Sequence, residues 1–403
     1  MKTVAVIAEY NPFHRGHAYH IEKIREELGE DSLVIAVMSG NYTQRGDLAI
    51  ADKFTRAEAA VRCGVNLVLE LPFPFSCSSA EFFAESGIKI ACAAGADTLS
   101  FGSETGEMAP LMEAAQNMRS EKYISALADF EDEAKSGGYS ASAFRIYERI
   151  FGKKSTAVLL TPNNLLSVEY IKASLKFNIP LSFHTVKRQG LGFNDTVLID
   201  GKLPSAAAIR GLVLGSSSED ALSMLPDESR SVFEMALSNG TFPASIERLS
   251  SAILTFFRLN TSPGTDIHDA DGGLYNRIQA KSLDATDISS LYSLSATKKY
   301  TNARIRRAVW YSLFSVTSSD MRSLPIYTQI LAFDDRGRMQ LKKIRKENNG
   351  LYFLTKPADF KFLPEQAARQ AELCRRADSV FMLSLPHPAP ANTDIRKSPY
   401  RKM

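Results

Sequence analysis

Short apolar runs alternate with amphipathic stretches along the N-terminal quarter of the chain. Runs rich in β-branched residues predict buried strands at 4–10, 33–38, 65–71 and 97–101. Between them, apolar positions recur at helical spacing and predict helices over 17–28, 52–63 and 79–94. Strands that alternate with helices in this way form βαβ units with right-handed crossovers. The pattern therefore predicts an α/β fold built on a parallel sheet.

The rest of the chain is mainly helical until its last quarter. Helices are expected over 107–150, with a break at Gly137 and Gly138, over 161–177, from Pro204 onward with Ser205 as N-cap, and through most of 220–325. A strand is expected at 181–186. The end of the chain predicts a small α/β module, with strands at 330–333, 351–354 and 379–383 and helices at 339–345 and 364–376. The proline-rich, basic tail after Pro386 is expected to be poorly ordered.

Length and composition favour several domains in a soluble protein. A chain of 403 residues exceeds one ordinary core, and the best boundary lies at Gly215 and the serines after it. The expected domains are a catalytic unit at 1–215, a helical unit at 216–325, and the C-terminal module with its tail at 326–403. No apolar run of about 18 residues and no secretion signal is evident, so no membrane partner is expected. The four cysteines lack metal-site spacing, which favours a reduced, cytoplasmic protein.

Two histidines of the sequence His14-Arg15-Gly16-His17 lie where the first strand gives way to the first helix. Free N–H groups and the helix dipole make such a helix N-terminus a ready anion site. Gly16 lets a phosphate approach the backbone, and each histidine offers a hydrogen bond or a positive charge. A metal site that includes His20 lacks a cysteine or carboxylate to complete it, and an exposed turn without function is the other alternative. We therefore predict phosphate binding for adenylyl transfer, with no metal ligands.

Polar residues also follow the ends of later strands, where the ligands of parallel sheets bind. Gln44 and Arg45, in the polar loop 39–47, either face a substrate or are solvated. Gly102 ends the fourth strand and lets an adenine or ribose lie against the backbone. Asn163 and Asn164 are either helix caps or contacts to the base.

Two arginines are candidates for holding phosphates. Arg188 follows the strand at 181–186 and is able to neutralise a phosphate. Arg210 lies in the first turns of a helix, behind the cap Ser205 and three alanines. It either belongs to an ordinary helix start or joins the helix N-terminus in holding the β- and γ-phosphates.

The C-terminal half carries a basic run, KKYTNARIRR at 298–307, with no acidic residue. A solvated helix face is the usual explanation of such a run. One sign of charge with an interleaved aromatic residue is also typical of contacts to an RNA backbone. Because the overall net charge is only +3, nucleic-acid binding requires a local patch such as this one. The candidate RNA-binding residues are Lys298, Lys299, Arg304, Arg306 and Arg307.

Seven segments, in order and spread over about three quarters of the chain, resemble a known family. They are AEYNPFHRGH (8–17), SGNYTQRGDLAIADKFTRAEAA (39–60), LVLELPFPFSCSSAEFFA (67–84), FGSE (101–104), PNNLLSVEYIKA (162–173), SAAAIR (205–210) and KKYTNARIRR (298–307). The chain is similar in them to the bacterial tRNA(Met) cytidine acetate ligases. The related superfamily signature I-S-S-T-x-I-R is kept only as Ser205, Ile209 and Arg210.

The resemblance implies a Rossmann-like HIGH-type nucleotidyltransferase domain that activates acetate with ATP as acetyl-adenylate. The acetyl group then passes to N4 of the wobble cytidine of elongator tRNA(Met), and AMP and diphosphate are released. The resemblance implies ATP with Mg²⁺ on its triphosphate as the cofactor, and acetate and elongator tRNA(Met) as partners. The sequence does not indicate an oligomeric state. The implied catalytic residues are His14, His17 and Arg210. The implied ATP-binding residues are Ile7, Ala8, Glu9, Tyr10, Asn11, Pro12, Phe13, His14, Arg15, Gly16, His17, Ala18, Tyr19, His20, Gly102, Asn163, Asn164 and Arg188.

Two other functions fit parts of the sequence. A cofactor-biosynthesis adenylyltransferase or a ligase similar to pantothenate synthetase shares the pattern of the first strands, but it leaves the basic C-terminal half without a role. A non-catalytic RNA-binding protein that keeps a nucleotide-binding fold is the alternative of another class. Intact His14, Gly16 and His17 argue against it.

Overall fold

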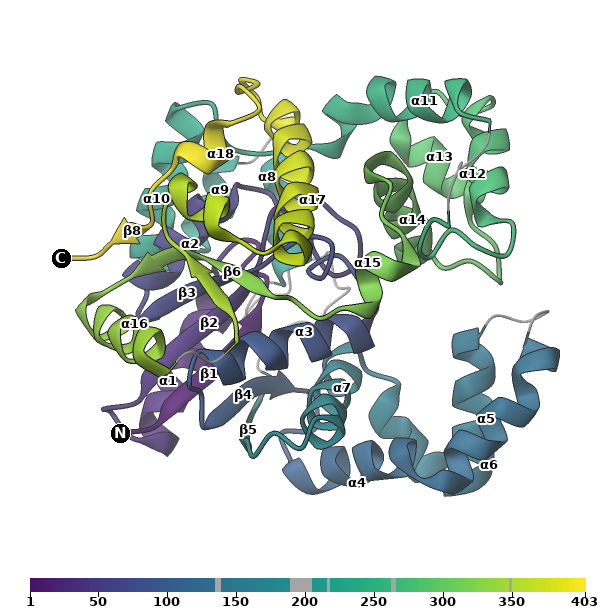
Figure 1. Cartoon of the computed structure of the whole chain (residues 1–403), viewed down its shortest axis with the longest axis horizontal. Coiled ribbons are helices and arrows are strands. Elements are labelled where there is room, and N and C mark those ends of the chain that lie inside the picture. The colour runs from purple at the N-terminus through teal and green to yellow at the C-terminus, as the bar shows by residue number, and fades with distance from the viewer. Residues whose placement is uncertain (135–138, 189–204, 216–217, 262–265, 348–349) are drawn as a thin grey trace.

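A mostly parallel sheet forms the centre of the molecule (Figure 1). The computed structural model describes residues 1–134, 139–188, 205–215, 218–261, 266–347 and 350–403. The strands are β1 (Thr3–Ala8), β2 (Leu33–Ser39), β3 (Leu67–Leu71), β4 (Thr98–Ser103), β5 (Ser182–Lys187), β6 (Tyr327–Phe333), β7 (Tyr352–Leu354) and β8 (Tyr400–Arg401). Their order is β5-β4-β1-β2-β3-β6-β7, with β8 also paired to β6. The α/β fold and the parallel pairing of the first strands are confirmed.

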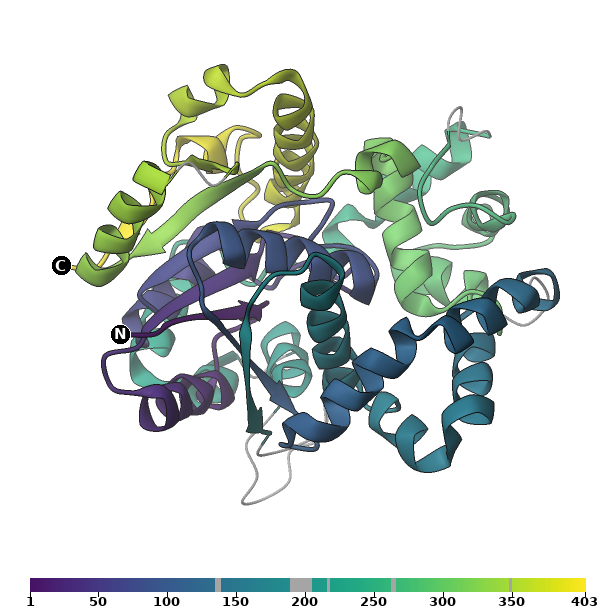
Figure 2. The same cartoon turned by 60° about the horizontal axis from the view of Figure 1, so that its bottom comes forward.

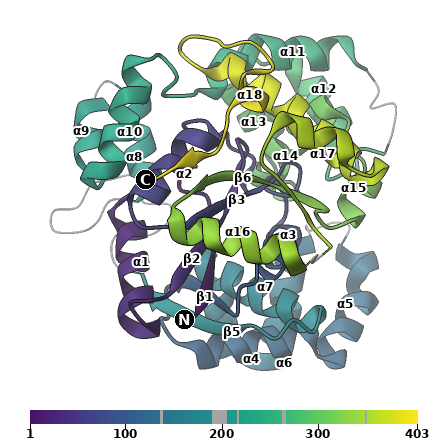
Figure 3. The ribbon, with the colours of Figure 1, turned by 60° about the vertical axis from the view of Figure 1, so that its left-hand side comes forward.

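Helices cover both faces of this sheet because successive residues of its strands are apolar on both sides. In β2, Leu33, Ile35 and Val37 join one core, whereas Val34, Ala36 and Met38 join the other. The second core is closed by α1 (Arg15–Leu28), α2 (Lys53–Arg62), α8 (Ala206–Leu214), α9 (Ser218–Ser223) and α10 (Asp227–Ser238). The first is closed by α3 (Ala80–Ala93), α7 (Pro162–Lys176) and α16 (Asp335–Glu347). Figure 3 shows α16 crossing in front of the strands and α8 to α10 beside α1 and α2.

The strand order places a ligand crevice at one position along the sheet. From β1 the chain continues to β2 and β3 on one side, and β4 and β5 then form on the other side of β1. Ligands of such sheets bind outside the carboxyl ends of the strands where the order reverses. Here that point lies between β1 and β4, so His14, which follows β1, and Gly102, in β4, face the same crevice edge.

Two helical groups stand away from the sheet (Figures 1 and 2). One group holds α4 (Met108–Arg119), α5 (Glu121–Ala134) and α6 (Tyr139–Leu159), and the expected break at Gly137 and Gly138 lies outside the described residues. The other holds α11 (Ser250–Leu259), α12 (Leu274–Ser282), α13 (Ile288–Ser295), α14 (Asn302–Phe314) and the short α15 (Ser318–Arg322). The mainly helical character of 220–325 is confirmed.

The C-terminal part differs from its prediction in two places. The expected strand at 379–383 is wrong, because these residues belong to α17 (Glu365–Phe381) and the 3₁₀ helix η3 (Met382–Ser384). The tail is not poorly ordered: it forms α18 (Thr393–Arg396) and then β8 beside β6. Moreover, β6 pairs antiparallel with β3, so the last quarter of the chain extends the N-terminal sheet. The division at 215 and 325 remains a prediction about domains.

None of the described helices is both long enough and apolar enough to span a lipid bilayer.

Candidate functional site

His14 and His17 cap the helix that they open. The imidazole Nδ1 of His14 accepts a hydrogen bond from the Gly16 N–H at 3.0 Å, and Nδ1 of His17 accepts one from the His14 N–H at 3.2 Å. The two rings stack with their centroids 3.8 Å apart. Gly16 is required here, because a Cβ at this position would lie 2.9 Å from Cε1 of His14. The predicted strand-to-helix junction is therefore a rigid turn.

These caps decide the protonation of both imidazoles. A neutral imidazole has one donor and one acceptor nitrogen, so an Nδ1 that accepts leaves the proton on Nε2. Burial, with the Arg188 and Arg210 charges, lowers the pKa of His14 to about 3. Burial, with His14 and Arg188 nearby, lowers the pKa of His17 well below its usual value. Of the two alternatives left open by the sequence, the structure favours neutral Nε2–H donors over positive charges.

Arg188 and Arg210 approach this turn from different parts of the chain. Both lower the pKa of His14 through their charge, which places them near its ring. The guanidinium of Arg210 donates to the carbonyl oxygen of Asn11 at 2.9 Å, and Ser205 caps α8 as predicted by accepting from the Ala208 N–H. The stem of Arg188 lies over Gly102, where a Cβ would be 3.3 Å from its Cγ. His14, His17, Gly102 and the two arginines are thus brought together.

Asn163 and Asn164 lie next to this group and are engaged within the protein. Asn164 Oδ1 accepts from the N–H groups of Glu104 and Thr105, and Asn163 Nδ2 donates to Glu104 Oε1 at 2.6 Å. In return, the carboxylate of Glu104 accepts from both asparagine N–H groups and so caps α7. These hydrogen bonds outweigh the cost of burial and lower the pKa of Glu104. Glu104, to which the sequence analysis assigns no role, holds the loop that follows Gly102 in place.

The loop 39–47 closes the other side of the crevice. The Gln44 N–H donates to Glu9 Oε1 at 3.0 Å, and Gln44 Nε2 donates to the Ser78 carbonyl at 2.9 Å. Burial raises the pKa of Glu9. The buried guanidinium of Arg56 donates to the carbonyl oxygens of Glu9, Ser39 and Gly40 and ties β1 to this loop. Gln44 thus holds neighbouring segments in place, and Arg45 is half-buried near Glu9.

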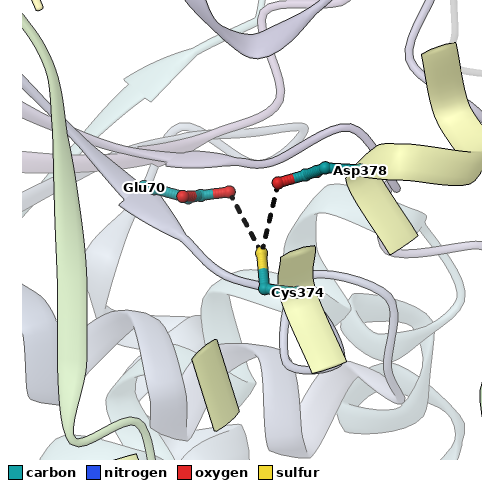
Figure 4. A group of neighbouring side chains, drawn as sticks. All are labelled: Glu70, Cys374 and Asp378. Atoms are coloured by element: carbon teal, nitrogen blue, oxygen red, sulfur yellow. Dashed lines mark hydrogen bonds between the residues drawn. The ribbon is translucent and has the colours of Figure 1, made fainter. Parts of the chain in front are cut away.

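A buried ionic group supports this loop from behind. Figure 4 shows the thiol of Cys374 directed at the carboxylates of Glu70 and Asp378, three groups that resemble a metal site. The Lys53 ammonium already bridges the two carboxylates, at 2.9 Å from Glu70 and 2.8 Å from Asp378. Asn41, in the loop 39–47, donates to Asp378 at 2.9 Å. The lysine supplies the positive charge that a metal would bring, and the group anchors the loop to α17.

The basic run at 298–307 leads into α14, and its five candidates differ in their surroundings. Lys298 and Lys299 are exposed before the helix begins, although Lys299 Nζ also lies 3.3 Å from the Gly272 carbonyl. The other three pair with acidic residues: Arg304 with Asp271, Arg306 with Asp47, and the buried Arg307 with Asp269. Trp310 Nε1 also donates to the Gly46 carbonyl. α14 therefore packs against the loop 39–47, whereas the basic helix α16 lies on the opposite side of the molecule (Figure 1).

Comparisons with known proteins agree with this architecture. The family model described as HIGH Nucleotidyl Transferase matches residues 1–394. The tRNA(Met) cytidine acetate ligase of Thermoanaerobacter sp. (strain X514) is 32% identical over 368 residues, which cover 90% of each chain. A crystal structure of apo Thermotoga maritima TmcAL superposes with a TM-score of 0.91 at 31% identity, over 100% of both chains. The same protein bound with alpha-thio ATP gives a TM-score of 0.89 at 30% identity, over 100% of this chain and 99% of that one.

Proposed function

The chain belongs to the HIGH nucleotidyl transferases and, among them, to the tRNA(Met) cytidine acetate ligases, and on that premise we propose that it joins acetate to tRNA at the expense of ATP. ATP activates acetate as acetyl-adenylate, and N4 of the wobble cytidine of elongator tRNA(Met) then takes the acetyl group. ATP and tRNA are both cytoplasmic molecules, so the proposal includes a cytoplasmic location. The observation that carries it is the helix-opening turn in which Nδ1 of His14 and Nδ1 of His17 both accept backbone hydrogen bonds, with the charges of Arg188 and Arg210 close to His14.

In the first step an acetate oxygen attacks the α-phosphorus of ATP. The new O–P bond forms as the bond from the α-phosphorus to the bridging oxygen breaks, and diphosphate leaves. Two anions must approach each other, so preorganised donors and positive charge lower the barrier. The imidazoles of His14 and His17 donate to phosphate oxygens without changing their own protonation. Arg188 and Arg210 supply the positive charge, and no protein nucleophile is needed.

The nucleoside half of ATP lies against β4 in this proposal. Gly102 leaves the backbone open, and the Arg188 stem covers the same position. The loop after Gly102 is fixed by Glu104 and the two asparagines at the N-terminus of α7. This supports Gly102, Asn163, Asn164 and Arg188 as the nucleoside end of the site, with the asparagines acting through the shape of the loop.

A Mg²⁺ ion on the triphosphate would be held by ATP and water rather than by side chains of this site. The groups around His14 are nitrogen donors, whereas Mg²⁺ requires oxygen ligands. Of the nearby carboxylates, Glu9 already accepts from Gln44 through one oxygen, and both oxygens of Glu104 accept from Asn163 or Asn164. The phosphate oxygens and water would therefore hold the ion, where it would neutralise charge on the leaving diphosphate.

In the second step N4 of the cytidine attacks the acetyl carbonyl carbon. The bond from this carbon to the phosphate oxygen breaks and AMP leaves. A proton from N4 passes to the phosphate of AMP or to water. The base must be splayed out of the anticodon loop to reach the acetyl group. The packing of α14 on the loop 39–47 supports an approach of RNA from this side. Among the five candidates, Lys298 and Lys299 are the most open to a phosphate backbone, and the three arginines hold the surface that presents them.

Mass spectrometry of tRNA nucleosides tests the overall reaction. Elongator tRNA(Met) incubated with the protein, ATP and labelled acetate should yield labelled N4-acetylcytidine. A transcript with uridine at the wobble position is the matched control and should stay unlabelled. Without tRNA, acetate should drive exchange of labelled diphosphate into ATP. Absence of both label and exchange would overturn the proposal, and exchange with another carboxylic acid but not with acetate would favour the rival ligases.

A further inference from the structure

A chain of four hydrogen-bonded side chains runs from the nucleotide site to the surface. Nε2 of His20 lies 2.7 Å from the Ser100 hydroxyl, and that hydroxyl lies 2.9 Å from Nδ1 of His184. Nε2 of His184 lies 2.9 Å from the Glu27 carboxylate. Ser100 is fully buried, whereas the side chain of Glu27 is 52% exposed. None of Ser100, His184 and Glu27 belongs to the turn that is expected to hold the phosphates.

Strand register explains why these residues meet beside Gly102. Ser100 of β4 and His184 of β5 are direct partners in the parallel ladder, so their side chains lie on the same face of the sheet. That face is the one covered by α1, because Leu99 and Phe101 point into the core on the other side. Gly102 is the next residue of β4 on the Ser100 face. Along α1, His20 lies one turn beyond His17, so it reaches Ser100 while His17 stays at the phosphate end.

Glu27, at the surface end of this chain of hydrogen bonds, sets which atom donates at each step. An ionised carboxylate only accepts, so a neutral His184 donates to Glu27 from Nε2 and leaves its Nδ1 as an acceptor. The Ser100 hydroxyl donates to that nitrogen, and its oxygen then accepts from Nε2–H of His20. The remaining nitrogen of His20, Nδ1, is therefore an acceptor, and it has no hydrogen-bond partner among the described residues. Burial, with His184 and Arg188 nearby, lowers the pKa of His20 to about 3, so the ring is neutral.

His20 thus has the polarity opposite to that of the first two histidines. His14 and His17 accept through Nδ1 and present Nε2–H donors, which suit phosphate oxygens. His20 donates through Nε2 and presents an acceptor, which suits an N–H or O–H group. Adenosine offers such groups in its 6-amino group and its two ribose hydroxyls.

We propose that Ser100 and His184 are positioning residues that hold His20 as a hydrogen-bond acceptor for a donor group of the adenosine of ATP. This inference rests on the proposed ATP site and adds a polar determinant at its nucleoside end. Ser100 and His184 act on nucleotide binding only through His20. Loss of either side chain therefore weakens ATP binding, while the chemical step at saturating ATP is preserved.

Direct ATP binding to the full-length protein, measured by calorimetry without acetate or tRNA, tests whether Ser100 and His184 position His20. Ser100→Ala should raise the Kd for ATP roughly three- to tenfold, as expected for one lost hydrogen bond. Thr98→Val is the matched control, since Thr98 is buried on the same face of β4 and its hydroxyl donates to Asp97, outside the chain of side chains that leads to His20. The KM for ATP in diphosphate exchange should rise in parallel with Kd, with kcat unchanged.

A second pair of variants covers the case in which Ser100→Ala fails to fold. His184→Asn keeps an oxygen acceptor near the place of Nδ1 and should bind ATP like the wild type. His184→Leu removes the acceptor and should behave like Ser100→Ala. Equal Kd values for both His184 variants would overturn the positioning role.

Nucleotide analogues identify the donor group. Inosine triphosphate lacks the 6-amino group, and 2′-deoxy-ATP and 3′-deoxy-ATP each lack one hydroxyl. The wild type should discriminate against one of the three, and Ser100→Ala should lose that discrimination while keeping the other two. Discrimination that is the same in wild type and Ser100→Ala for all three analogues would overturn the inference. A wild-type protein that binds no ATP would instead refute the proposed function.

Discussion

The replacement His14→Asn separates the two tasks of this side chain. As N-cap of α1, His14 accepts from the Gly16 N–H, and in the proposed ATP site it offers its Nε2–H to a phosphate. Asparagine is one of the best N-cap residues but lacks a donor at the place of Nε2. A hydrogen bond to a charged group contributes about 1.5–3 kcal/mol, and each 1.4 kcal/mol is a factor of ten. Acetate-dependent diphosphate exchange should therefore fall roughly 10- to 150-fold.

The variant His14→Ala provides the comparison for stability. It loses the donor and also the cap, which costs about 1 kcal/mol of stability relative to asparagine. Both variants should thus lose the same factor in exchange, while urea denaturation should show His14→Ala less stable than His14→Asn by that amount. Exchange by His14→Asn at the wild-type rate would refute the assignment of His14 as a phosphate donor.

The lowered pKa of His14 adds a dependence on pH. The folded state keeps this imidazole neutral down to about pH 3, whereas an unfolded histidine binds a proton near pH 6.5. Between these values only the unfolded chain is protonated at this position, so the stability falls as the pH falls below about 6.5. The contribution is up to about 1.4 kcal/mol per pH unit. Denaturation of His14→Asn between pH 6.5 and 5 should therefore show a slope shallower by that amount, and an unchanged slope would contradict a neutral His14.

Two further predictions concern charged residues. Lys299→Ala should weaken tRNA binding a few-fold and lower its salt slope by about one, with tRNA-free exchange unchanged. Arg307→Ala should chiefly lower the urea midpoint, because it removes the nearer cation of the partly buried Asp269 and leaves only the longer pair with Arg304. Equal loss of tRNA affinity without loss of stability in both variants would contradict this contrast. Lys53→Met should destabilise the fold by about 3–5 kcal/mol near neutral pH, measured by urea denaturation, because it leaves two buried carboxylates without their cation. Burial raises the pKa of Asp378, so the loss should shrink at acidic pH as this carboxylate takes up a proton. A loss that is constant with pH would argue against the ionic explanation.

Much of the N-terminal half could be predicted from the sequence because its signals are local. The strand at 33–38 is observed as β2 (Leu33–Ser39), and the helix at 52–63 as α2 (Lys53–Arg62) with Asp52 as its cap. Buried parallel strands require continuous apolar runs, and amphipathic helices require apolar residues at a period of 3.6. A few neighbouring residues are therefore enough to predict each element. The turn from His14 to His17 is also local, since its hydrogen bonds join residues two or three positions apart.

Other features depend on residues that are far apart in the chain. The pairing of β6 with β3 and of β8 with β6 follows no local pattern, so the sequence predicts a poorly ordered tail where the structure has β8. A basic run in the sequence likewise gave no sign that Arg307 would be buried against Asp269. In the sequence, Lys53 is an ordinary lysine at the start of a helix. Its ion pair with Asp378 of α17, 325 positions away, is visible only in the folded chain.

The sequence alone predicted a strand-to-helix turn as the candidate phosphate site, and it named the histidines and arginines that the structure brings together there. The tertiary structure alone decided their chemical states. The proton positions on His14, His17 and His20 depend on burial and on hydrogen-bond partners, some of which, such as Ser100 and His184, lie far along the chain. A residue type specifies which protons a side chain is able to carry, whereas desolvation and neighbouring groups, which exist only in the folded chain, specify which of them it does carry.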